Sequence, residues 1–122
     1  MNPMHELSIA MSIVEMAEQE AIQRKARVNA VHLKLGKLAG VVKDALLSSY
    51  ELASAGTELE GSRLVIEELA VIVFCPKCQA PRTLDSIQWF ACPECEGPVS
   101  DVIQGRELQV AALEIQALEV QQ

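Results

Sequence analysis

The four cysteines of the chain form two Cys-x-x-Cys pairs, Cys75 with Cys78 and Cys92 with Cys95. Two such pairs, with thirteen residues between them, match the spacing of structural zinc sites. The two residues inside each pair allow a tight turn to direct both sulfurs at one ion about 2.3 Å away, and the second pair completes a tetrahedron. Because four thiolates leave no ligand position for water, the pattern predicts a zinc ion that stabilises structure rather than one that catalyses.

Other uses of the four cysteines remain open as alternatives. Disulfides are typical of secreted chains, whereas the first residues here contain no apolar signal segment. A thioredoxin-like redox motif needs one Cys-x-x-Cys rather than two. A rubredoxin-like iron centre would use the same four sulfurs, and reversible disulfides could join them. Colour distinguishes the metals, because ferric thiolate is red and zinc is spectroscopically silent.

The composition argues against several classes of function. The chain has 122 residues, half of them apolar, and a net charge of −7 at pH 7. It has no basic stripe and few aromatic side chains for base stacking, so a nucleic-acid partner is not expected. No apolar run is long enough to span a membrane. We therefore expect a soluble, cytoplasmic protein.

Two segments have the periodicity of amphipathic helices. In residues 4–25, polar side chains recur every three or four residues and apolar side chains occupy the opposite side. The polar stripe comprises Ser8, Ser12, Glu15, Gln19 and Gln23, and the apolar side comprises Leu7, Met11, Val14, Ala17 and Ala21, widened by Ile9, Ile13 and Met16. A second helix is predicted over residues 42–55, before Gly56, because glycine is favoured at C-terminal caps. Its apolar positions are Leu46, Leu47, Tyr50 and Ala53.

Three segments have the alternation typical of strands. They are residues 28–35, 63–69 and 107–117. In the first, Val31 and Leu33 share one face, while His32 and Lys34 share the other. We expect His32 to be an exposed strand histidine rather than a metal ligand, because no cysteine or carboxylate lies two residues away. In the last, the apolar parity changes near Ala111, which predicts a bulge.

The segment between the second and third strands contains both cysteine pairs. Residues 82–84 and 88–91 are predicted to form its short hairpin strands, and the apolar run 71–74 could prolong the strand before it. Trp89 and Phe90 precede the second pair, and we expect them to form a small apolar core below the metal.

The order of elements predicts the fold class. Helix, strand, helix, strand, zinc ribbon and strand form an α+β fold, in which two helices pack on a three-stranded sheet and the zinc-ribbon module is inserted before the last strand. The predicted domains are residues 1–70 with 106–122, and residues 71–105.

The chain resembles the HypA/HybF family of hydrogenase-maturation nickel chaperones. The resemblance is carried by the start Met4-His5-Glu6-Leu7-Ser8, the strand and turn of 28–40, the helix 42–55 and the Cys-Pro-x-Cys…Cys-Pro-x-Cys ribbon. These motifs follow one another in the family's order and cover nearly the whole chain. The combination of a His-Glu start with a ribbon before a final strand is specific to this family, whereas either half alone would not be.

The resemblance implies a second metal site at the N-terminus. It assigns nickel(II) to Met4, His5 and Glu6, with His5 as the principal ligand, and zinc to the four cysteines. The chemistry suits the assignment, because nickel(II) favours planar sets of nitrogen ligands. The imidazole and the deprotonated amide of His5 form one chelate ring, which the preceding amide and a free terminal amine can complete.

The residues Met1-Asn2-Pro3 depart from the family's pattern. Where they are present, the terminal amine lies away from His5, and usable amides end at Met4 because Pro3 has no N–H. Asn2 and Pro3 also suit the cap and first position of a helix, which would draw the His5 amide into the first turn. Two possibilities stay open: the mature chain starts at Met4, or the site is weaker and uses other ligands.

The resemblance also implies a function and partners. The chain would be a metallochaperone rather than an enzyme, delivering nickel to a [NiFe]-hydrogenase precursor together with the maturation GTPase HypB. Some relatives also serve urease maturation. One alternative is a zinc-ribbon protein–protein adaptor, including a transcription-linked module, with no delivered metal. Another is an electron-transfer protein with an iron–tetracysteine centre.

Overall fold

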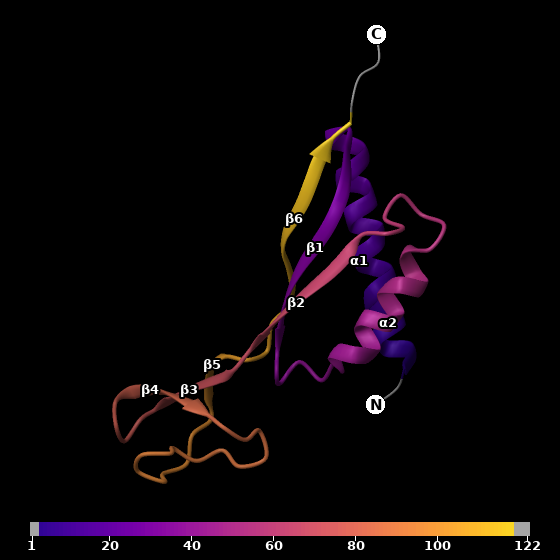
Figure 1. Ribbon diagram of the computed structural model, residues 1–122. Coiled ribbons are helices and arrows are strands. Elements are labelled where there is room, and N and C mark those ends of the chain that lie inside the picture. The colour runs from indigo at the N-terminus through magenta and orange to yellow at the C-terminus, as the bar shows by residue number, and fades with distance from the viewer. Residues whose placement is uncertain (1–2, 119–122) are drawn as a thin grey trace. The chain divides into compact units, whose positions relative to one another are not determined.

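The computed structural model describes residues 3–118, with side chains described from residue 5, and it confirms the predicted α+β fold (Figure 1). The elements, in chain order, are α1 (Pro3–Arg24), β1 (Ala26–Gly36), α2 (Lys43–Ser54), β2 (Arg63–Leu69), β3 (Val71–Cys75), β4 (Ala80–Leu84), β5 (Asp101–Gln104) and β6 (Leu108–Ala117). The strands form two three-stranded sheets, ordered β2-β1-β6 and β4-β3-β5. Neither helix is both long and apolar enough to cross a membrane, within the part of the chain described.

The chain divides into two compact units, which are described separately. It leaves the first unit after Leu33, returns at Val41, leaves again after Ile66 and returns at Val110. The first unit contains both helices, and the second contains all four cysteines. Residues 34–40 belong to the cysteine-containing unit, whereas the predicted domains place them with the helices. The boundaries of independently folding domains stay a prediction.

The core of the first unit is formed by both helices and the first sheet. Its buried side chains include Ala10, Ile13, Val14, Ala17 and Ala21 from α1, Val28, Val31 and Leu33 from β1, and Leu46 and Tyr50 from α2. Every member of the polar stripe predicted for the first helix is exposed. The second helix ends at Ser54, one residue before the predicted end, and after the extended cap residue Ala55 the predicted glycine, Gly56, adopts a positive φ of 76°. The strand β6 contributes Val110 and Leu113, which are three residues apart, so its inward parity changes between them.

The position of Met11 differs from the one predicted for it on the apolar side of the first helix. Its side chain was expected in the core, but the residue is 58% exposed. The buried stripe of α1 includes Ala10, Val14 and Ala17 instead. Neighbouring residues lie about 100° apart around a helix, so the stripe that contains Ala10 leaves Met11 beside it. The periodicity alone does not determine which of two adjacent apolar residues the rest of the fold covers.

The second unit is built around β3, which pairs antiparallel with both β4 and β5. The predicted strand 82–84 is confirmed within β4, but the predicted strand 88–91 is wrong. Only Ala91 of that segment pairs, in an isolated bridge with Pro98. The partner on the other side of β3 is β5, which is four residues long and too short to show a period in the sequence. The run 71–74 begins this second sheet rather than prolonging β2.

Two glycines allow chain segments of the second unit to pass very close to each other. A Cβ atom on Gly36 would lie 2.1 Å from the carbonyl oxygen of Gly105. Gly105 itself has a φ of 130°, which favours glycine. The backbone N–H of Leu38 donates to the same Gly105 carbonyl at 2.7 Å, and that of Gly36 donates to Glu107 at 2.8 Å. The turn after β1 is therefore held by backbone bonds for which only glycine leaves room.

Candidate metal sites

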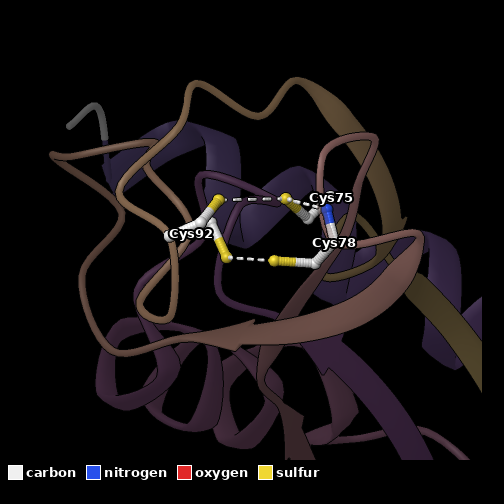
Figure 2. A group of neighbouring side chains, drawn as sticks. Cys75, Cys78 and Cys92 are labelled. Atoms are coloured by element: carbon white, nitrogen blue, oxygen red, sulfur yellow. Dashed lines mark hydrogen bonds between the residues drawn. The ribbon is translucent and has the colours of Figure 1, made fainter.

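The four cysteines predicted to bind zinc come together in the second unit. All four Sγ atoms lie within 4.8 Å of one another, and Figure 2 shows the sulfurs of this cluster pointing toward one another. The Sγ atoms of Cys75 and Cys95 are 3.6 Å apart, and those of Cys78 and Cys92 are 3.9 Å apart. A tetrahedron with zinc–sulfur bonds of about 2.3 Å has edges of about 3.8 Å. The cluster therefore fits a tetrahedral metal site, and its sulfurs are much farther apart than the roughly 2.05 Å of a disulfide.

The local turns hold these sulfurs through the backbone. The N–H groups of Cys78, Glu94 and Gly97 each donate to a cysteine sulfur at 3.4 Å. The residue after each pair, Gln79 or Glu96, adopts a positive φ, of 55° and 62° respectively. A left-handed residue turns the chain sharply, so each pair is followed by the same reversal. The two knuckles thus share the turn that follows each pair, whereas the N–H that bonds the first sulfur belongs to Cys78 in one and to Glu94 in the other.

The thiols of the cluster differ in acidity when no metal is bound. Burial opposes the ionisation of Cys92, but N–H groups of Cys95 and Glu94 and the neighbouring thiols lower its pKa to about 6. Hydrogen bonding with Cys95, together with burial, raises the pKa of Cys78 to about 11. A metal ion must therefore displace protons from the cluster, and the raised pKa of Cys78 makes its proton harder to displace than that of Cys92.

The structure separates the residues of the predicted nickel site. His5 is exposed in the first turn of α1, whereas Glu6 is only 1% exposed. The Oε2 atom of Glu6 accepts a hydrogen bond of 3.1 Å from the backbone N–H of Val42, the residue that caps the N-terminus of α2. The side chain of Met4 lies outside the described residues. Within the described part of the chain, the cysteine cluster is the only group of three or more potential metal-binding side chains.

We expect Glu6→Ala to destabilise the protein even without nickel. The change removes the acceptor of the Val42 N–H, and because this hydrogen bond is only partly buried its loss costs about 0.5–1.5 kcal/mol. Glu6→Gln keeps an acceptor oxygen and should lose less. Thermal unfolding of the nickel-free protein measures both effects, with Glu15→Ala on the exposed side of the same helix as the control. If Glu6→Ala unfolds at the same temperature as Glu15→Ala, the hydrogen bond does not anchor the first turn.

His32 has a partner that the sequence did not reveal. Its Nε2 lies 2.5 Å from Oε2 of Glu114, and Arg63 Nη2 lies 3.8 Å from the same oxygen. Hydrogen bonding to His32, and the charges of His32 and Arg63, lower the pKa of the Glu114 carboxyl. The partner is 82 residues away in sequence, so no local spacing could indicate it. An adjacent arginine makes this pair a poor site for a metal cation.

Two side chains of the second unit differ from what the sequence indicated. Trp89 was expected in the core below the metal, but it is 75% exposed, while Phe90 packs against that core as predicted. The loop after β4 carries Trp89 outward because it forms no strand that would fold its side chain back. Arg82 was not singled out, yet its guanidinium lies against Cys78 and Cys92. The sequence did contain a signal for this, because Arg82 and the buried Leu84 alternate with Thr83 in β4 and so lie on the same face of the strand.

Known proteins resemble this chain over nearly its whole length. The family model described as "Hydrogenase/urease nickel incorporation, metallochaperone, hypA" matches residues 4–115. The "Hydrogenase maturation factor HypA" of Chloroflexus aurantiacus is 50% identical over 112 residues, which cover 91% of this chain and 98% of that protein. The protein of the same name from Streptomyces avermitilis is 41% identical over 112 residues, covering 90% of this chain and 86% of its own.

Solved structures share the fold. The solution structure of the Ni metallochaperone HypA from Helicobacter pylori aligns with a TM-score of 0.62 at 22% identity, over 93% of this chain and 98% of that one. A second structure, described as the solution structure of HypA protein, has a TM-score of 0.67 at 23% identity, over 94% and 98%. These likenesses concern the fold alone, and the family match confirms the resemblance drawn from the motifs. This chain belongs to the HypA family of hydrogenase/urease nickel-incorporation metallochaperones.

Proposed function

We propose that the protein binds Ni(II) at His5 and delivers it to a [NiFe]-hydrogenase precursor during maturation. The observation that supports this most is the family match, which begins at residue 4 and so includes the Met4-His5-Glu6 start. His5 is exposed in the first turn of a helix, where backbone N–H groups have no intrahelical acceptor. An imidazole next to such amides can form the planar nitrogen set that nickel(II) favours.

The two metals have different roles in this proposal. The four cysteines hold zinc, and because their sulfurs close its coordination sphere, this ion stabilises the ribbon and is not the delivered cargo. Nickel is cargo at a site that can open, since the His5 side chain faces solvent. Glu6 stays bonded to Val42 in this conformation, so it supports the position of the first turn. Met4 contributes its amide to the nickel site.

The proposed partners follow from this role. Delivery of the metal makes and breaks only coordination bonds, so the protein acts as a carrier rather than an enzyme. The recipient is the hydrogenase large-subunit precursor, with the GTPase HypB as the cooperating maturation protein and urease maturation proteins as further recipients. We propose that the chain meets these partners in the cytoplasm.

Nickel transfer tests the proposal. The zinc-loaded protein, loaded with one equivalent of radioactive nickel, is mixed with the purified hydrogenase precursor with and without HypB, and nickel in each component is counted after separation. We expect nickel to move to the precursor faster than it moves from a small-molecule nickel complex of equal affinity. If the protein takes up no stoichiometric nickel, or if transfer is no faster than from that complex, the chaperone role is wrong.

One observation favours the adaptor alternative for the second unit. Trp89 is 75% exposed and Ile87 is 49% exposed, and tryptophan is enriched at protein interfaces. Trp89 also lines a pocket of about 330 Å³ that contains Asp85 and Glu96. Titration of the zinc-loaded protein with nickel separates the two functions, because an adaptor without delivered metal would show no specific nickel binding.

A further inference from the structure

Arg82 is a charged residue on the inner face of a small apolar module. In the ladder of β3 and β4 it lies opposite Val73, and Leu84 lies opposite Val71. Both valines and Leu84 are buried. Side chains two residues apart share one face of a strand, so the stem of Arg82 runs along the same face as Leu84, toward the core. Strand β4 exposes Pro81 and Thr83 on its other face.

A guanidinium in such a place needs a nearby negative charge. The Nε atom of Arg82 is buried and has no hydrogen-bond partner among the described residues. Burying a charge costs much free energy unless an opposite charge lies beside it. The guanidinium lies against the sulfurs of Cys78 and Cys92, and this contact raises the pKa of Arg82. Another nitrogen of the guanidinium, Nη1, donates to the carbonyl oxygen of Pro81 at 3.2 Å.

The metal site supplies the negative charge. A zinc ion with four thiolates has a net charge of about −2, and Cys75 and Cys92 are buried. The backbone donors of the two knuckles offset this charge only with partial dipoles. The two sulfurs that Arg82 contacts come from different knuckles and form one edge of the tetrahedron, 3.9 Å long.

We propose that Arg82 is the counter-charge of the zinc–tetrathiolate centre and bridges its two knuckles across the Cys78–Cys92 edge. Arg82 touches sulfurs and not the metal, so it acts as a positioning residue. Its positive charge makes the thiolates less basic and slows their attack by protons and competing ligands. The protein therefore retains zinc more tightly than four cysteines alone would achieve. This inference rests on the cysteine cluster binding zinc and is independent of the nickel proposal.

Zinc affinity in the full-length, zinc-loaded protein tests the role. Arg82→Met keeps an apolar side chain and removes the charge. Arg82→Lys keeps the positive charge but replaces the planar guanidinium by a single ammonium group. Arg63→Met is the matched control, because it changes the net charge equally at a side chain that is 68% exposed in the other unit. Competition with a chromophoric chelator measures affinity. We expect a loss of about 10- to 100-fold for Arg82→Met, as for other residues that support metal ligands, a smaller loss for Arg82→Lys and no loss for Arg63→Met.

A spectroscopic measurement separates a charge effect from lost packing. With cobalt(II) in place of zinc, the sulfur-to-metal charge-transfer band reports the electrostatic field at the sulfurs. Removing a positive charge raises the energy of the sulfur electrons, so Arg82→Met should shift this band to longer wavelength. Arg82→Lys should shift it less. Part of the difference in affinity should persist at about 1 M salt, because Arg82 is half-buried and a partly buried contact is screened less than an exposed one.

Three results would overturn the inference. One is an unchanged zinc affinity for a folded Arg82→Met protein, as judged by far-ultraviolet circular dichroism. Another is equal loss for the lysine and methionine variants with an unmoved cobalt band, which would indicate packing alone. The third is failure of both variants to fold with zinc, because a counter-charge predicts that lysine restores most of the binding. Folding of Arg82→Lys but not of Arg82→Met would support the inference.

Discussion

Replacing His5 by alanine is expected to abolish stoichiometric nickel binding, whereas replacing His32 by alanine should leave it nearly intact. His5 is exposed beside free amides in the first turn of α1, so its ring and the backbone can reach one ion. His32 already contacts Glu114, whose carboxylate is shared with the cation Arg63. A positive charge there disfavours a second cation. Isothermal titration of the zinc-loaded variants with nickel measures both effects, and zinc content should be unchanged in each.

Removing Met1-Asn2-Pro3 provides a sharper test of the same site. With these residues present, amide coordination ends at Met4, because Pro3 has no N–H. A chain that starts at Met4 has a free terminal amine within reach of the ion, so we expect tighter nickel binding and a stronger absorption band from planar nickel. Equal binding by both forms would mean that the terminal amine is not a ligand. Nickel binding that survives His5→Ala would refute the proposed site.

Removing zinc, by a chelator or by Cys92→Ala, is expected to unfold residues around 71–105 while the helix-containing unit largely persists. The core of the ribbon is small and includes Cys75 and Cys92 themselves, so its packing depends on the metal. Binding of structural zinc to comparable small modules releases about 10–16 kcal/mol, which is as large as the stability of a whole domain. The core of the first unit contains no cysteine and should be retained.

Hydrogen exchange followed by mass spectrometry measures this effect segment by segment. Loss of zinc should remove protection from β3, β4 and β5 but leave that of α1 and β1 largely unchanged. Ser86→Ala, at an exposed position of the same module, is the control and should keep the zinc-loaded pattern. Protection that is unchanged across the ribbon after zinc removal would show that the metal is not needed for its fold. Elemental analysis of the same samples distinguishes zinc from an iron centre.

The sequence by itself determined the features that depend on local spacing. The two Cys-x-x-Cys pairs predicted the metal cluster, because a turn of four residues positions two sulfurs whatever surrounds it. The three- and four-residue periodicity predicted both helices within two residues of their observed ends, since an amphipathic stripe is a property of one segment. The order of elements then implied that the ribbon is inserted before the last strand. The sheet β2-β1-β6 agrees with this, because its last strand follows the ribbon in sequence.

The tertiary structure alone decided which side chains meet across long separations. Glu6 bonds to a backbone N–H 36 residues away, and His32 meets a carboxylate 82 residues away. Strand β5 exists because β3 offers it an open edge, and its own four residues carry too little pattern to predict it. Arg82 faces inward because the register of β4 places it opposite Val73, and the exposure of Trp89 depends on a loop that forms no strand. Such contacts arise from pairing and packing between distant segments, which a linear pattern does not encode.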